Sequence, residues 1–132
     1  MLYNALVKNF NPHIEEEVTV EINSAEITGF MPSGISFEPK KGVLYPLSLS
    51  LIILNDLDIQ EDRSLKYGLF NIEESFAYHI KGIVDCEKKT INIGFELGLE
   101  DEIVNEMWQY NHKRVQIKVD RIDIDFLEGH FK

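Results

Sequence analysis

The sequence lacks the features that would indicate a membrane or disulfide-bonded protein. Cys86 is its single cysteine, so an intrachain disulfide is impossible. The longest apolar run, residues 51–54, is far shorter than the ~20 residues that a membrane-spanning helix needs. Residues 1–8 carry no basic segment, long apolar core or small-residue cleavage site, so no signal peptide is predicted. These absences predict a soluble protein that stays in the cytoplasm.

The sequence also lacks the spacings on which catalytic and cofactor sites depend. Its glycines form no phosphate-binding loop, its histidines show no metal-ligand spacing, and Gly34–Glu38 lacks the second glycine of a serine nucleophile elbow. Lys88 and Lys89 could lower the pKa of the Cys86 thiol. A catalytic cysteine also needs a base, and hairpin pairing could place His79, the nearest one in sequence, some way from Cys86. We therefore expect an incidental exposed cysteine. We predict no catalytic residue, no metal and no cofactor, and hence no enzyme.

Charge is the strongest indication of a partner. Asp and Glu number 23 against 13 Lys and Arg, which gives a formal net charge of −10. A field of that sign repels phosphate backbones and anionic membrane surfaces, so it disfavours both as partners. It favours fast, salt-sensitive association with a basic protein. The alternative is that the acidity serves solubility alone.

Two segments far apart in the chain, residues 18–27 and residues 115–124, share one apolar pattern. Each has three alternating apolar residues, then two polar neighbours, then alternation resumed in the opposite phase. Alternation predicts a strand with one buried face, and a β-bulge at the polar pair would absorb the extra residue. We therefore predict two long bent strands with bulges at residues 23–24 and 120–121.

We expect these two bent strands, about residues 18–31 and 114–126, to pair antiparallel with each other. Such pairing would join the two ends of the sheet and remove its free edges. Glu21 and Lys118 would then meet across the pair.

Local patterns predict the other elements, while residues 1–14 are weakly patterned. These elements are a turn at residues 32–34 with a return strand at 35–37, a central strand over 47–54, an acidic loop over 55–63, a short strand over 67–72, and a hairpin with arms at 76–80 and 91–99 around the loop 85–89.

Residues 100–111 are the one convincing helix, because acidic residues occupy its first turn and cations follow its end. Ile103, Val104, Met107 and Trp108 form its apolar face. Trp108 is therefore expected to pack on the sheet; as an exposed side chain it would instead be an interface hot spot.

These elements predict a mainly β protein that is a single domain over residues 1–132. We expect a strongly bent antiparallel sheet of about six or seven strands that closes as a barrel or sandwich, with one α-helix before the last strand. An OB-type barrel that binds single-stranded nucleic acid is not favoured, because the lysines are few and interspersed with acids, and the helix comes late.

The acidic residues gather in patches, and each patch is either a partner-binding surface or a solvated charged face. The segment 56–62 is rich in carboxylates, but Glu61 and Tyr67 stand where a calcium loop requires glycine and glutamate. Asp123 and Asp125 share an outward strand face about 6–7 Å apart, where two carboxylates could bind a cation or act as acid and base. The sequence offers no third ligand for a cation there. The candidate partner-binding residues are Asp56, Asp58, Glu61, Asp62, Glu73, Glu74, Glu102, Glu106, Asp123 and Asp125.

The chain is small, acidic, rich in bent strands and empty of catalytic motifs, and this profile resembles that of the small bacterial immunity proteins. Such proteins neutralise a cognate, often basic, toxin nuclease by capping its active site. The likeness is one of type rather than of residues. It implies a cytoplasmic protein-binding module with a basic protein partner and no nucleic-acid or membrane partner. The alternatives are a small-molecule-binding β-barrel and an accessory domain that self-associates through a strand edge; the oligomeric state stays open.

Overall fold

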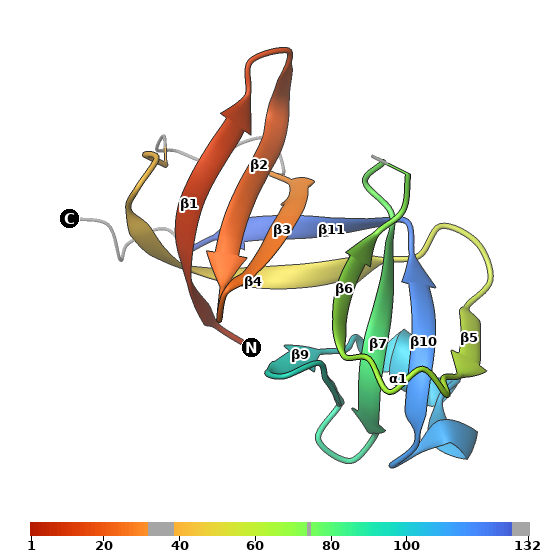
Figure 1. Ribbon diagram of the computed structural model, residues 1–132. Helices are drawn as coiled ribbons and strands as arrows, with labels where there is room; N and C mark the ends of the chain where they lie inside the picture. The colour runs from red at the N-terminus through yellow and green to blue at the C-terminus, as the bar shows by residue number, and fades with distance from the viewer. Residues whose placement is uncertain (32–38, 74, 128–132) are drawn as a thin grey trace. The chain divides into compact units, whose positions relative to one another are not determined.

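The computed structural model describes residues 1–31, 39–73 and 75–127. Its main elements are strands, with a closed five-strand barrel, a second sheet and one short α-helix before the last strands, so the predicted fold class is confirmed (Figure 1). The chain forms two compact units. The barrel unit comprises residues 1–49 and the C-terminal segment from residue 122, and the second-sheet unit comprises residues 50–121.

The barrel is closed by strands from both ends of the chain. Around it, β1 (Tyr3–Asn11), β2 (Ile14–Ile22), β3 (Ala25–Phe30), β11 (Arg121–Phe126) and β4 (Leu44–Ile52) follow one another, and β4 pairs back with β1.

Apolar side chains fill the interior of the barrel. Alternate residues of each strand face inward, and Val7, Val20, Ile27 and Ile124 are fully buried there. The ring of Phe126 meets that of Tyr45 edge to face, with 5.7 Å between their centroids. Side chains already fill an eight-stranded barrel, so a five-stranded one with bulky inward residues has a packed core.

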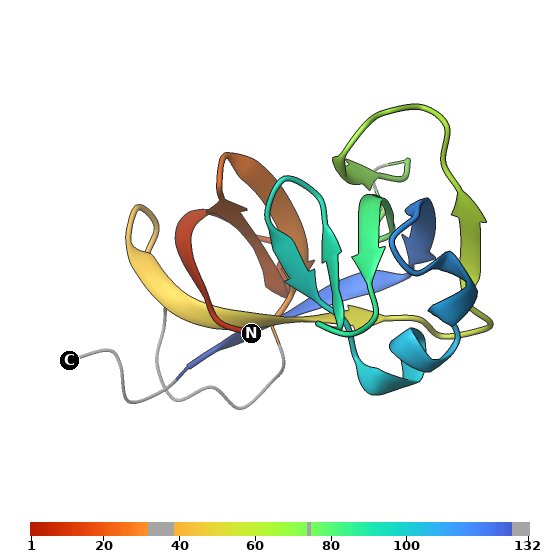
Figure 2. The same ribbon diagram turned by 90° about the horizontal axis from the view of Figure 1, so that it is seen from below.

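The second sheet is arranged around β7 (Tyr78–Asp85). One edge of β7 pairs with β10 (Arg114–Val119), which in turn pairs with β5 (Asp58–Glu61). The opposite edge of β7 is divided between β6 (Gly68–Asn71) and β8 (Thr90–Asn92), and β8 continues to β9 (Glu96–Gly98). Figure 2 shows β5 on one side of this sheet and the hairpin of β8 and β9 on the other.

Gly82 occupies the point on β7 where the pairing partner changes from β6 to β8. A Cβ atom at this position would lie 2.1 Å from the carbonyl oxygen of Asn92 and 3.0 Å from Cγ2 of Ile93. Only glycine allows the two backbones to approach so closely.

The prediction of bulges is wrong at both positions. Asn23 and Ser24 have φ values of 49° and 67° and form the two-residue turn of the β2–β3 hairpin, in which Ile22 pairs with Ala25. Asp120 separates β10 from β11, which belong to different sheets. In both places the polar pair lies at the boundary between two strands. The apolar residues that follow it in the opposite phase therefore belong to the next strand.

The predicted antiparallel pairing of residues 18–31 with residues 114–126 is also wrong. The contact between them is the parallel pairing of β3 with β11, in which Phe30 is the partner of Asp123. The register partners of Glu21 are Leu6 and Glu26, and those of Lys118 are Asp58 and His79.

Several other boundaries differ from the prediction. The weakly patterned N-terminus forms β1, the predicted loop 55–63 contains β5, and the predicted arm 91–99 is divided into β8 and β9 by a turn at Gly94 (φ 107°). The strand predicted over 67–72 is present as β6, and the loop predicted over 85–89 is present as a turn. The turn and return strand predicted over 32–37 lie outside the described residues.

The predicted helix over residues 100–111 is too long. The structure has α1 over Asp101–Asn105 and a separate 3₁₀ turn over Trp108–Tyr110. The predicted end of the helix is tied to β7 and to the turn after it, because Asn111 Oδ1 accepts from the backbone N–H of Cys86 and the N–H of His112 donates to the carbonyl of Val84. Trp108 is 52% exposed, so the expectation that it packs on the sheet is wrong.

Candidate functional site

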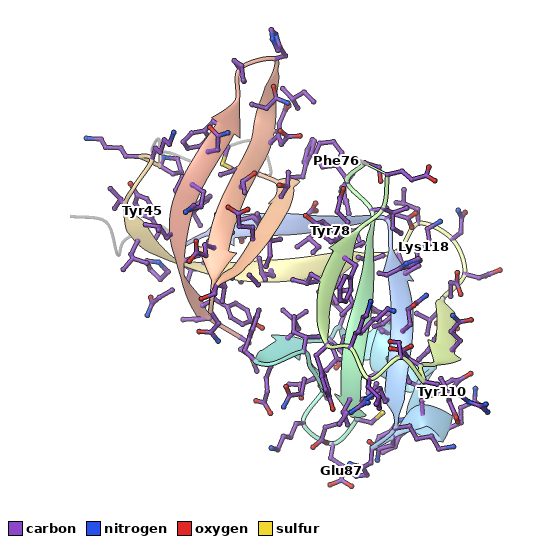
Figure 3. The ribbon with its side chains drawn as sticks, in the orientation of Figure 1. Tyr45, Phe76, Tyr78, Glu87, Tyr110 and Lys118 are labelled. Carbon is purple, nitrogen blue, oxygen red and sulfur yellow. The ribbon has the colours of Figure 1, made fainter. Side chains whose placement is uncertain are left out.

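The acidic segment 56–62 lies beside basic side chains of the same unit. Asp58 on β5 is the register partner of Lys118 on β10. Glu61 accepts from Lys113, whose Nζ lies 3.1 Å from Oε1. Figure 3 shows Lys118 on β10. This patch therefore presents acidic and basic groups together, which weakens its negative field.

Asp62 is also held by neighbouring groups. Its Oδ2 accepts from the hydroxyl of Ser64 at 2.8 Å. Desolvation is the largest single effect and raises the pKa of Asp62, but the hydrogen bonds from Ser64 and the positive charges of Lys81 and Arg114 together outweigh it and lower the pKa. The Arg114 guanidinium in turn lies 4.5 Å from the ring centroid of Tyr67 and donates to its hydroxyl. These contacts fasten the loop after β5 to the sheet, which is a structural role.

The remaining acidic candidates of the second-sheet unit are not brought together into one site. Asp56, Glu73, Glu102 and Glu106 are exposed and belong to separate turns and to the short helix. Glu74 lies outside the described residues.

The outer face of the barrel unit gathers carboxylates from three neighbouring strands. Asp123 and Asp125 alternate with buried Ile122, Ile124 and Phe126 on β11, so they share the outward face as predicted. Glu17 and Glu21 on β2 and Glu26 on β3 face outward in the same way, because they lie in the opposite phase from the buried residues of their strands: Val18, Val20, Ile22 and Ile27. We call these residues the barrel acidic face: Glu17, Glu21, Glu26, Asp123 and Asp125.

The strand register places two of these carboxylates opposite each other and two more on either side of Phe30. Glu21 is the partner of Glu26 across β2 and β3, and Phe30 pairs with both Glu17 and Asp123. Facing like charges destabilise a sheet, and Lys8, whose Nζ lies 3.2 Å from Glu21, offsets part of this cost.

Sequence reasoning missed the glutamates of this face. The signal was present, since Glu17 and Glu21 lie in the opposite phase from Val18, Val20 and Ile22, which marks them as outward. Their convergence with β11 could not be seen, because it depends on a pairing between the two ends of the chain.

Burial raises the pKa of two groups of the second-sheet unit, the buried Cys86 and the half-buried Glu100. Cys86 is 1% exposed, so the expectation of an exposed cysteine is wrong, and burial together with the charge of Asp85 raises the pKa of its thiol. Burial also raises the pKa of Glu100, and a backbone hydrogen bond from Leu51 only partly opposes this. Among the described residues, Oε2 of Glu100 has no hydrogen-bond partner. The Cys86 thiol is a poor nucleophile, because its raised pKa disfavours the thiolate.

Within residues 1–31, 39–73 and 75–127, no group of three or more His, Cys, Asp or Glu residues could hold a metal ion. None of the helical segments in that part of the chain has the length and apolar character needed to span a bilayer.

A family model described as "Uncharacterised conserved protein UCP019853" matches residues 1–127. The chain belongs to this family. Comparison with curated proteins found no match, and comparison with solved structures found none either.

Proposed function

We propose that this protein is a non-enzymatic protein-binding module that recognises a basic protein partner through its barrel acidic face. In the manner of an immunity protein, it would neutralise a basic enzyme, such as a toxin nuclease, by covering it. Such a function requires an acidic, shape-complementary surface on a rigid support and assigns no catalytic residue.

One observation supports the proposal above all: the carboxylates of three adjacent barrel strands all lie on the outer surface of the barrel. The sequences of the five barrel strands contain seven acidic residues against two basic ones, Lys8 and Arg121. The acidic segment of the second-sheet unit is instead accompanied by Lys81, Lys113, Arg114 and Lys118. A field from unbalanced charges steers a basic partner, whereas a mixed patch does so much less.

The geometry gives less support to the two alternatives. A small-molecule barrel needs an internal cavity, and the inward positions here hold bulky side chains such as Phe126, Leu47 and Ile124. Association through a strand edge needs a long, uncharged edge, but the barrel is closed and the edge strand β5 is short and carries Asp58 and Glu61.

The test is affinity capture of the tagged protein from its native lysate, with elution in salt steps and identification by mass spectrometry. We expect one basic protein at near-equal stoichiometry, released at moderate salt, and the enzymatic activity of that partner should fall when the purified acidic protein is added to it.

Charge reversal distinguishes the barrel acidic face from general acidity. Glu26→Lys should weaken the binding by roughly tenfold, chiefly through a slower association. Glu87→Lys is the matched control, because Glu87 is an exposed glutamate in the β7–β8 turn of the other unit and its reversal changes the net charge equally (Figure 3). Equal loss in both variants would show that net charge, and not this face, governs binding.

A further inference from the structure

Exposed apolar side chains collect on the outer face of the barrel where β1 meets the start of β4. Leu44 is 65% exposed and Val43 is 41% exposed. Leu44 is the register partner of Leu6, and the carbonyl of Val43 accepts from the N–H of Val7. Two positions further along β4, Pro46 pairs with Asn4 on the same face. We call the exposed Val43 and Leu44 together with the half-buried Leu6 and Pro46 the apolar step.

Single exposed apolar residues are ordinary on protein surfaces, but grouped ones mark an interaction site. Leu44 and Leu6 face each other directly, at the separation where cross-strand side chains touch. Neither is required for the barrel interior, since the inward positions of these strands belong to Ala5, Val7 and Tyr45.

The apolar step continues directly into the barrel acidic face. One row across four neighbouring strands joins Leu44 to Leu6, Leu6 to Glu21, and Glu21 to Glu26. With strands about 4.8 Å apart, this row follows about 14 Å of the curved barrel wall, and the apolar step adjoins the barrel acidic face where Leu6 pairs with Glu21. An apolar centre beside a charged rim is the usual anatomy of a protein-binding surface.

We infer that the apolar step is the hot spot of the proposed interface and that its occupant is an apolar side chain of the basic partner. The partner would place that side chain against Leu6 and Leu44 while neighbouring lysine or arginine side chains reach Glu21 and Glu26. The adjoining carboxylates select this occupant, because they repel an anionic membrane and because two copies with a net charge of −10 repel each other. This inference rests on the proposed function and adds a requirement on the partner: an apolar residue flanked by cations.

Two synthetic peptides test this requirement on the full chain. One is a short lysine-rich peptide with leucines between its lysines, and the other has serines at the leucine positions. Binding is followed by the amide chemical shifts of the ¹⁵N-labelled protein. We expect the leucine peptide to bind at least about fivefold more tightly, with the largest shifts at Leu6, Glu21 and Leu44.

A matched pair of variants locates the contact. Leu44→Ser should remove the preference for the leucine peptide, whereas Leu54→Ser should leave it intact, because Leu54 is equally exposed at 68% but lies in the second-sheet unit. Glu26→Lys should weaken both peptides alike, since each is rich in lysine.

Each other outcome overturns the inference in a recognisable way. Equal binding of both peptides, weakened by Glu26→Lys and by salt, would remove the apolar hot spot and retain the acidic face. Binding that neither Leu44→Ser nor Glu26→Lys changes would overturn the proposed function as well. Concentration-dependent self-association that Leu44→Ser abolishes would make a second copy the occupant.

Discussion

Replacing Ser24 with glycine should stabilise the protein. Ser24 is the second residue of the β2–β3 turn and has a φ of 67°, a left-handed conformation that costs a non-glycine residue roughly 1–2 kcal/mol. Asn23, the first turn residue, tolerates this conformation better because its short polar side chain bonds locally. The variant would create the Asn-Gly pair that two-residue hairpin turns favour.

The size of the effect follows from two opposing terms. Glycine relieves a strain of about 1–2 kcal/mol but makes the unfolded chain more flexible, which costs about 0.5–1 kcal/mol. The net gain is at most about 1.5 kcal/mol and about 0.75 kcal/mol at the midpoints of the two ranges, which for a chain of 132 residues corresponds to a rise in Tm of about 3 °C.

Urea and thermal unfolding, followed by circular dichroism, measure this gain. Ser24→Ala is the control, because it removes the hydroxyl while keeping the Cβ atom, and it should not raise the Tm. The sign of the change in Ser24→Gly is decisive. If residues 18–31 formed one continuous strand with a bulge, glycine within it would destabilise the protein by about 0.5–1 kcal/mol. A lowered Tm would therefore refute the hairpin turn.

Three further predictions concern the second-sheet unit. Gly82→Ala should lower the free energy of unfolding by about 3 kcal/mol, because the new Cβ would lie 2.1 Å from the backbone oxygen of Asn92, which cannot move alone. An unchanged urea midpoint would contradict the close approach of β7 and β8. Because burial raises the pKa of Glu100, the native state holds its proton to higher pH than the unfolded chain does. The free energy of unfolding should therefore fall as pH rises from the ordinary glutamate pKa through the raised one. Glu100→Gln should reduce this dependence on pH, measured by urea titrations at a series of pH values. An unchanged dependence would argue against a buried carboxylate. Cys86 should react with a thiol reagent far more slowly in the native protein than in urea, and equal rates would show that it is accessible.

Some features of the fold could be predicted because they depend on neighbours in sequence. The alternation of Val18, Val20 and Ile22 identifies a strand with one buried face, and β2 has these residues fully or almost fully buried. The loop over 85–89 was predicted from polar residues between apolar arms, and the side chain of Asp85 indeed accepts from the N–H groups of Glu87 and Lys88.

The candidate site was predicted only in part, for the same reason. The outward phase of Asp123 and Asp125 follows from the buried residues between and beside them. Their grouping with the glutamates of β2 and β3 follows from the parallel pairing of β3 with β11 and from the β2–β3 hairpin. The charge balance around residues 56–62 likewise depends on β10, which lies more than fifty residues away in the chain.

The sequence alone determined the strand-rich composition, the phase of the apolar residues and the net charge of −10, because each is local or additive. The tertiary structure decided whether a polar pair such as Asn23-Ser24 is a bulge or a turn, since both absorb the same change of phase and differ only in which strand comes alongside. It also decided which carboxylates stand together and that Leu6, Leu44 and Glu21 form one row. Register between distant strands is set by how whole faces pack, and no local pattern contains that information.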